Sequence, residues 1–270
     1  MLHEQVRLWA MAKRIADSGK PVYQQVADSI RAKIRAGEFA PGSQLPTEKA
    51  LLEEFEVARA TVRQGLTVLV NEGLIVPSRP RGYFVREREL SYYRPQSEWR
   101  PQPASPEMDR WMSDQTTLGR KPSQEITVEI INPPTKVANR LDLEPDALVA
   151  ARRRVRYLDG EPFNINDSYY PYELVQGTEI VNPADVARGT NKALAELGYE
   201  QVRAIDEVEA RMPLPDEATR LGLGPGSPVA VHSVTGYTAD NTPVRHTVNV
   251  LIGSKHIILF ERERPTGSEA

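Results

Sequence analysis

Hydrophobic residues recur at helical spacing in the N-terminal part of the chain. Val22, Val26, Ile30 and Ile34 lie four residues apart, which predicts an amphipathic helix that begins after Pro21 and ends near Gly37. Apolar residues recur in the same way over 51–57 and again over 62–70, which predicts two shorter helices. Only a short turn at 56–58 separates these two, and helices that cross at such a turn form a helix-turn-helix.

A β-hairpin is predicted directly after this helix pair. Residues 74–76 and 83–85 are strand-like, and the segment 77–82, with proline and glycine, supplies the turn between them. Before the pair, Thr47 is a suitable N-cap for the first of the two helices. The order of three helices and a hairpin predicts a winged helix-turn-helix.

Arginines stand where such a fold contacts DNA. The second helix of a helix-turn-helix enters the major groove by its N-terminal end, and Arg59 and Arg63 lie four residues apart on one face of that end. Arginine can bind guanine or phosphate there with two parallel hydrogen bonds. Arg79 and Arg81 lie at the hairpin tip, from which arginine can reach the minor groove; the alternative is that they are solvated loop charges.

The second half of the chain has a different pattern. Six strands are predicted, at 126–131, 148–157, 163–170, 202–212, 229–237 and 244–251. Helices are predicted at 136–141, 183–197 and 215–221. A short helix, a Leu-x-Leu turn, a strand, a polar hairpin and a second strand occur twice, from 137 and again from 218, which indicates an internal repeat of an antiparallel α+β unit.

Between the two halves, the segment 88–106 is rich in proline and charge and has little apolar periodicity. It is predicted to be a semi-rigid linker. Its aromatic residues Tyr92, Tyr93 and Trp99 suggest that part of it docks on a domain.

Composition limits the chemistry. The chain of 270 residues has a net charge of −3 and no cysteine, which excludes disulfides, thiolate metal ligands and a cysteine nucleophile. Residues 20–90 carry 11 Lys and Arg against 9 Asp and Glu, so the small basic surplus lies where the helix-turn-helix lies. The four histidines have no metal-ligand spacing, and no phosphate-binding loop or Ser-His-Asp set is present. We therefore expect neither an enzyme nor a metal or cofactor, and the lack of a long apolar run favours a cytoplasmic protein.

Residues 21–86 resemble the winged helix-turn-helix of GntR-type bacterial transcription regulators. The resemblance lies in three strings in the family's order, PVYQQVADSIRAKIRAGEFAPGSQLP, TEKALLEEFEVARATVRQGL and NEGLIVPSRPRGYFV. It implies double-stranded DNA as partner and the following DNA-binding residues: Lys49, Arg59, Thr61, Arg63, Arg79, Arg81 and Gly82. The chain departs from the family at Lys49, where many relatives have arginine, at Ala58, where serine is common, and at Pro80, where glycine is usual.

The repeated α+β unit behind this head resembles the effector-binding UTRA domain of the HutC subfamily, which has a chorismate lyase-like fold. The resulting fold class is α+β. The predicted organisation is an N-terminal extension at 1–20, a winged helix-turn-helix at 21–87, a linker at 88–106, a UTRA domain for effector binding and dimerisation at 107–264, and a tail at 265–270.

The candidate effector site lies on two neighbouring predicted strands. Alternate residues of a strand share a face, so Arg152, Arg154 and Arg156 project together. In relatives that bind phosphorylated sugars, the equivalents of Arg154 and Arg156 hold the phosphate, and the next strand contributes further contacts. The resemblance thus implies an effector site made of Arg154, Arg156, Asn166, Ser168, Tyr170 and Arg245. Arg245 stands where relatives often have glutamate, which favours an acidic, phosphorylated or carboxylated ligand; the alternative is an exposed strand with surface salt bridges.

Together these features predict a sequence-specific transcription regulator. We expect a homodimeric repressor that binds a pseudo-palindromic operator, because one head contacts too few base pairs for specificity. A small acidic metabolite is expected to modulate the affinity for DNA. The alternative is a regulator whose C-terminal domain only dimerises and has no effector.

Overall fold

The computed structural model describes residues 19–78, 80–86, 90–99 and 108–262. Residues 1–18 of the predicted N-terminal extension, the tail at 265–270 and Arg79 lie outside the described residues. The chain divides into two compact units, residues 1–89 with 224–227 and residues 90–223 with 228–270, and each is described by itself below. Among the described residues, no helix combines the length and the apolar character that crossing a membrane requires.

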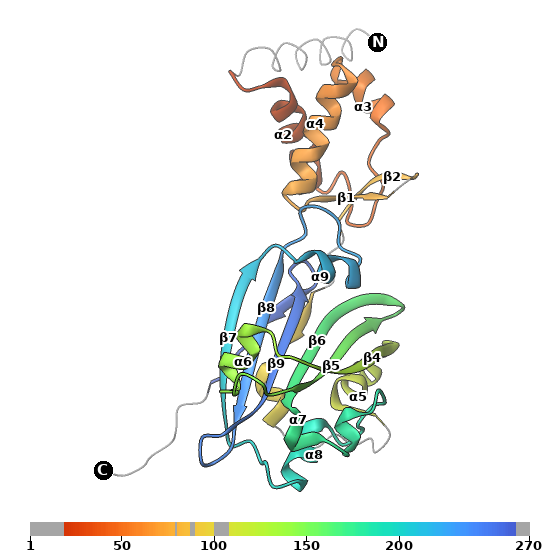
Figure 1. The fold of residues 1–270 in the computed structure, drawn as a ribbon. Helices are drawn as coiled ribbons and strands as arrows, with labels where there is room; N and C mark the ends of the chain where they lie inside the picture. The colour runs from red at the N-terminus through yellow and green to blue at the C-terminus, as the bar shows by residue number, and fades with distance from the viewer. Residues whose placement is uncertain (1–18, 79, 87–89, 100–107, 263–270) are drawn as a thin grey trace, which may run out of the picture. The chain divides into compact units, whose positions relative to one another are not determined.

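The first unit is a bundle of three helices followed by a β-hairpin (Figure 1). Its elements are α2 (Val22–Arg35), α3 (Glu48–Phe55), α4 (Arg59–Asn71), β1 (Ile75–Ser78) and β2 (Gly82–Val85). The core is built from one apolar stripe of each helix and from both strands, as the periodicity predicts: Val26, Ile30, Leu51, Phe55, Val62, Leu66, Leu69, Ile75 and Val85.

Helices α2 and α4 approach closely at Gly65. A Cβ atom on Gly65 would lie 2.9 Å from the Tyr23 carbonyl oxygen and 3.2 Å from Cγ1 of Val26. A larger residue would push the helices apart, so the glycine fixes the distance between α4 and its support helix. The turn between α3 and α4 begins at Glu56, whose φ of 52° ends α3 in the left-handed conformation.

The second unit is built on a six-stranded antiparallel sheet in the order β4-β5-β6-β9-β8-β7. The strands are β4 (Pro122–Ile131), β5 (Val149–Leu158), β6 (Glu161–Pro171), β7 (Arg203–Arg211), β8 (Val229–Tyr237) and β9 (Pro243–Ile252). The internal repeat corresponds to two three-stranded halves, β4-β5-β6 with helix α6 (Thr135–Arg140) and β7-β8-β9 with helix α9 (Pro215–Arg220). The halves join where β6 pairs with β9.

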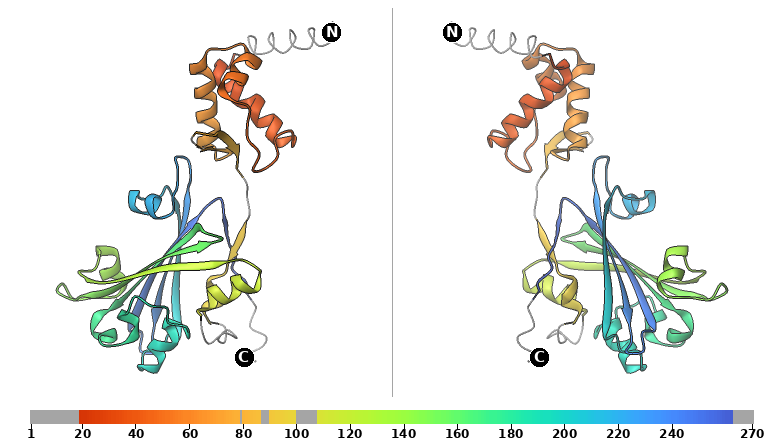
Figure 2. Two further views of the ribbon diagram at one scale, coloured as in Figure 1. Left: turned by 90° about the vertical axis from the view of Figure 1, so that its right-hand side faces the viewer. Right: turned by 90° about the vertical axis from the view of Figure 1, so that its left-hand side faces the viewer.

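The two faces of this sheet are covered differently. In Figure 2, α6 and α9 lie on one side of the sheet, and α5 (Arg110–Thr117) and β3 (Ser91–Tyr93) lie on the other. On the first side, Val137 and Leu141 pack on Val149 and Ala151. The second side is also covered by α7 (Tyr172–Val175) and α8 (Thr190–Glu196).

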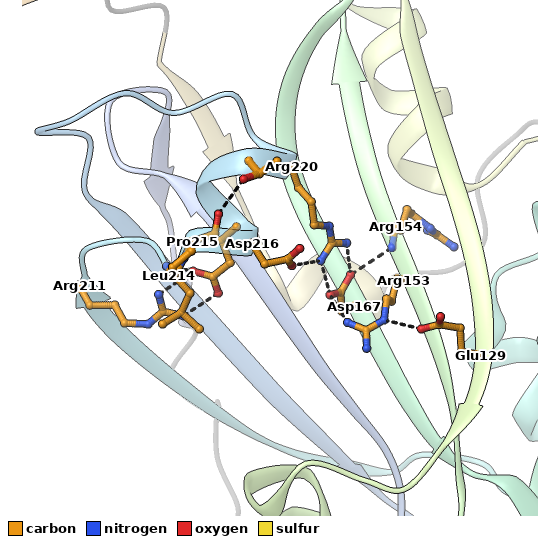
Figure 3. A network of polar contacts seen from close by, with 11 residues as sticks. Glu129, Arg153, Arg154, Asp167, Arg211, Leu214, Pro215, Asp216 and Arg220 are labelled. Atoms are coloured by element: carbon orange, nitrogen blue, oxygen red, sulfur yellow. Dashed lines mark hydrogen bonds and ion pairs between the residues drawn. The ribbon is translucent and has the colours of Figure 1, made fainter.

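An ionic network anchors α9 to the first side (Figure 3). Arg220 donates from both terminal nitrogens to the two oxygens of Asp167 at 2.7 Å, and Asp167 also accepts from the backbone nitrogen of Arg154 at 3.1 Å. Burial opposes the charge of Arg220, but the hydrogen bonds and charge of Asp167 outweigh it and raise the pKa of Arg220. The network therefore belongs to the scaffold and lies behind the site described below.

Two segments differ from the sequence-based expectation. The predicted helix at 183–197 is helical only over α8, because residues 183–189 form an irregular loop that ends at Gly189 with φ of 84°. Within the predicted linker, Ser91–Tyr93 forms β3, which pairs in parallel with β10 (His256–Ile258), and a 3-10 helix follows at Pro95–Trp99. Backbone pairing over so few residues leaves no apolar periodicity in the sequence.

Candidate DNA-binding surface and effector pocket

The front of α4 presents arginines to solvent. Arg59 and Arg63 are exposed, and the side chain of Arg63 keeps 61% of its surface accessible. Its Nε donates to the Glu48 carboxylate, with 2.9 Å to Oε2 and 3.2 Å to Oε1. Because Glu48 is the first residue of α3, this contact orients the guanidinium of one helix from the other.

The remaining predicted DNA contacts flank these arginines in the sequence. The side chain of Lys49 is 80% exposed and lies 3.9 Å from Glu53, so its charge is directed to solvent. Thr61 is half-buried in the first turn of α4. Ala58 is the N-cap of α4 and makes no side-chain cap hydrogen bond, as the sequence predicts from its missing hydroxyl.

The hairpin tip carries Arg81 in a supported conformation. Its Nη2 donates to Ser78 Oγ at 3.1 Å, and its guanidinium carbon lies 5.2 Å from the centre of the Phe84 ring. The following residue, Gly82, has φ of 101°, which a side chain disfavours, so the tip requires glycine there. Gln44 donates to the carbonyl oxygen of Arg81 and joins the tip to the segment before α3.

The second unit contains a pocket of about 540 Å³ on the sheet face that bears α5 and β3. The strand register explains its polar floor, because Arg156 is paired with Asn164, Arg152 with Ser168 and Ala150 with Tyr170. All six residues predicted to bind an effector line it: Arg154, Arg156, Asn166, Ser168, Tyr170 and Arg245. Arg154 and Arg245 are buried and Arg156 is half-buried, so these arginines do not form the exposed, salt-bridged strand considered as the alternative.

Arg152 shares the face of Arg154 and Arg156 but has another role. It is 1% exposed, and its guanidinium donates to three backbone carbonyl oxygens, those of Ile180, Asn182 and Ala184. Burial lowers its pKa, and the positive charge of Arg154 lowers it further. Arg152 therefore holds the segment 180–184, and it does not line the pocket.

Residues that the sequence reading missed complete the pocket. Asp109 is the N-cap of α5, and its Oδ2 lies 3.0 Å from Arg154 Nη1 and 3.4 Å from Arg156 Nη2. Trp111 lies beneath Arg156, 4.7 Å from guanidinium carbon to ring centre. Helix α5 has no apolar stripe in the sequence, because it buries no residue deeply. The sequence marks only its ends, with an aspartate before it and Leu118-Gly119 after it.

A row of polar side chains extends from the pocket across the sheet. Asn166 donates to Asn249 Oδ1 at 2.6 Å, Asn249 donates to the His232 carbonyl oxygen at 3.3 Å, and His232 Nε2 lies 2.7 Å from Asp206. The Tyr93 hydroxyl of β3 lies 3.0 Å from Nδ1 of the same histidine. The row thus joins the pocket floor to the strand that follows the DNA-binding head in the sequence.

The pocket contains no set of metal-binding side chains within the described part of the chain, where no three His, Asp or Glu residues gather to hold an ion. The arrangement that is present consists of guanidinium, amide and hydroxyl groups. Such groups bind anions and sugar-like hydroxyls without a metal.

Comparison with known proteins identifies both units. The family model described as bacterial regulatory proteins, gntR family, matches residues 22–85, and the UTRA domain model matches residues 117–257. An HTH-type transcriptional regulator of Streptomyces coelicolor, SCO4628, is 32% identical over 257 residues, which cover 91% of this chain and 94% of the relative. The HTH-type transcriptional repressor NagR of Bacillus subtilis is 26% identical over 246 residues, which cover 90% of this chain and 96% of NagR. A crystal structure of a GntR-family regulator superposes with a TM-score of 0.62 at 24% identity, covering 91% of this chain and 98% of that one.

Proposed function

Because the chain belongs to the GntR family of bacterial regulatory proteins and carries a UTRA domain, we propose that it is a dimeric repressor whose operator affinity falls when a small anionic metabolite binds. The chain is a transcription regulator and not an enzyme. The proposal concerns repression as opposed to activation, the operator, the dimer and the chemistry of the effector. A named relative, NagR, is a repressor, which supports repression.

The exposed arginines of the head support recognition of a duplex. Arg59 and Arg63 extend from the first two turns of α4, at the end where a recognition helix meets base edges. Arg81, and Arg79 outside the described residues, belong to the hairpin that reaches the minor groove in this proposal. Lys49, Thr61 and Gly82 complete the proposed contact set, with a lysine that binds phosphate as a point charge.

The observation that carries the effector proposal is the gathering of three arginines, Arg154, Arg156 and Arg245, in one pocket of the second unit. Several cations that line one concave, partly buried site favour a ligand with a phosphate or carboxylate group. Asn166, Ser168 and Tyr170 lie beside them and supply amide and hydroxyl groups for the uncharged part of the ligand.

Ligand binding is proposed to act through differential affinity. An effector that binds better to one arrangement of the dimer than to another shifts the population toward it, and operator affinity follows. By linkage, the operator must weaken effector binding by the same factor.

The DNA-binding part of the proposal is tested with Arg63→Ala. We expect the variant to lose about 1–3 kcal/mol of operator binding and to discriminate less well at the base pair that Arg63 contacts. The measurement is a mobility shift at fixed salt, with an operator selected from genomic fragments. Arg35→Ala is the matched control, because it removes the same charge from an exposed position at the end of α2. Unchanged specificity of Arg63→Ala would contradict the proposal.

The effector part is tested by thermal unfolding with a panel of phosphorylated and carboxylated metabolites. A true effector at one hundred times its dissociation constant should add about 2.7 kcal/mol to the stability of the wild-type protein. It should add little to Arg154→Gln. If no anion stabilises the protein, the second unit serves for dimerisation alone, which is the alternative function.

A further inference from the structure

The arginine pair at the centre of the effector pocket already has an anion from the protein itself. Asp109 is only 6% exposed, and a single oxygen of its carboxylate, Oδ2, contacts both Arg154 and Arg156. Its other oxygen, Oδ1, accepts from the backbone nitrogen of Met112 at 2.9 Å and so caps α5. Both oxygens of this side chain are therefore engaged, one with the pocket and one with a helix.

Electrostatics show that Asp109 is held there as an anion. Burial by itself would raise the pKa of this carboxyl group, but the charges of Arg156 and Arg154 outweigh burial and the pKa is lowered. The hydrogen bond from Met112 acts in the same direction. A carboxylate bridging two guanidinium groups in a pocket has the geometry that a ligand phosphate or carboxylate would need.

We propose that Asp109 is an internal counter-anion, and that the anionic group of the effector binds by displacing it from Arg154 and Arg156. The inference rests on the proposed function, because it assumes that an anion binds this pocket. Two anions at one arginine pair in a largely buried site would repel each other strongly, so exchange is favoured over addition. Exchange also sets specificity, because a neutral ligand that replaced the carboxylate would remove a negative charge from beside both arginines and supply none in return.

The exchange has a mechanical consequence for α5. When the carboxylate leaves the arginines, its second oxygen moves with it, and the first turn of α5 loses its cap. Trp111 and Asp114 of this helix line the pocket, and the Trp111 ring supports the guanidinium of Arg156. Ligand binding is thus converted into a loosening of the N-terminal end of α5.

The competing explanation is that Asp109 is a permanent support that orients the two arginines for the ligand. In that case its negative charge assists binding, and removing the charge would leave anion affinity unchanged or weaken it. The two explanations therefore predict opposite effects of one substitution.

The test is binding of inorganic phosphate to the full-length protein by isothermal titration calorimetry. Asp109→Asn keeps the size of the side chain and a cap acceptor but removes the charge, so we expect phosphate to bind at least tenfold more tightly than to the wild type. Asp114→Asn is the matched control, because Asp114 lines the same pocket, is 57% exposed and pairs with Arg110. We expect this control to change phosphate affinity by less than threefold.

A second readout follows α5 itself by hydrogen-exchange mass spectrometry. Phosphate should speed exchange in the peptide spanning residues 109–117 of the wild-type protein, and should leave that peptide unchanged in Asp109→Asn. Asp109→Ser provides a second neutral variant that retains a good N-cap, in case the asparagine protein does not fold.

The outcomes separate this inference from the proposed function. If Arg154→Gln abolishes phosphate binding while Asp109→Asn binds like the wild type or more weakly, the effector site stands and the exchange is overturned. If Asp109→Asn and Asp114→Asn tighten binding equally, the effect is a general one of charge and the exchange is again overturned. If neither the wild-type protein nor any variant binds phosphate, the proposed anionic effector site fails together with the exchange.

Discussion

The arginines of the two units differ in how their charge is compensated. In the DNA-binding unit, Arg59, Arg63 and Arg81 are exposed, and Arg63 has a single acidic partner, Glu48, at the edge of its guanidinium. In the UTRA unit, Arg152 and Arg154 are buried and bonded to carbonyl oxygens or a carboxylate. Water solvates the exposed guanidinium groups that are free to contact DNA. A buried charge is not solvated, so a group of the protein itself must compensate it.

This difference has a consequence for what each unit can recognise. An exposed guanidinium gains little from any one surface contact, so the head depends on many phosphate and base contacts made together. A buried guanidinium is already desolvated, so a single well-placed anion can contribute a large part of the binding free energy. In the proposed function, a few arginines therefore bind duplex DNA in one unit and an anionic metabolite in the other.

The largest effect is expected when a buried arginine that binds only backbone carbonyl oxygens is replaced. Arg152→Met fills a similar volume but leaves three carbonyl oxygens of the segment 180–184 without this donor, so we expect a loss of about 3–5 kcal/mol in the free energy of unfolding. Urea denaturation of the full chain measures this loss. Arg153→Met is the matched control on the opposite face. Its pair with Glu129 is exposed, and its 3.9 Å contact with Asp167 is to a carboxylate that Arg220 already binds, so the loss should stay near about 1 kcal/mol. Equal losses in the two variants would refute the distinction.

The next largest effect is expected from acid, which should destabilise the second unit more than the first. Burial lowers the pKa of His246 and of His256 to about 4, and residues 19–89 contain no histidine. Well above pH 6.5 the rings are neutral in both the folded and the unfolded chain, so their full contribution to stability is present. As the pH falls from 6.5 toward 4, the unfolded chain binds protons at these histidines before the folded chain does. The free energy of unfolding therefore falls by up to about 3 kcal/mol for each ring.

Hydrogen-exchange mass spectrometry of the intact protein at pH 7 and pH 5, corrected for intrinsic rates, reports on the units separately. We expect protection in the second unit to fall more than protection in the first. His256→Gln should remove part of that difference, because glutamine stays neutral and can still donate to the Ile252 carbonyl oxygen. If protection fell equally in both units and His256→Gln had no effect, groups other than these histidines would cause the acid response.

How much the sequence reveals also differs between the two kinds of site. The strands of the large sheet were predictable from alternation and from the internal repeat, and the period of two places Arg154 and Arg156 on one face with no further information. Asp109 was not predictable as their partner, because the contact spans 45 residues and its helix lacks an apolar stripe. The first part of the predicted helix, at 183–189, was wrongly expected to be helical, because an irregular loop that Arg152 binds at the Asn182 and Ala184 carbonyl oxygens replaces local helical bonding there.

A smaller effect is expected at the hairpin tip of the DNA-binding unit. Arg81→Ala removes one exposed charge, so operator affinity should fall by about 1 kcal/mol and the slope of log affinity against log salt by about one unit. Fluorescence anisotropy with labelled operator at several salt concentrations provides both values. A full loss of binding would mean that the tip holds the fold together rather than the DNA; stability measured on the same sample identifies that case.

The smallest expected effect adds a group instead of removing one. Ala58 is the N-cap of α4 and offers no side-chain acceptor to the first turn, although α4 carries Arg59 and Arg63. Ala58→Ser should therefore stabilise the head by about 0.5–1 kcal/mol, because the hydroxyl can accept from a backbone N–H of that turn. It should also tighten operator binding slightly, since the serine hydroxyl faces the end of the helix that approaches DNA. Ala60→Ser, which places the same hydroxyl inside the helix, is the control and should stabilise nothing. Protection of the amides of α4 against hydrogen exchange measures the gain, and an unchanged rate in Ala58→Ser would show that this turn is already satisfied by other means.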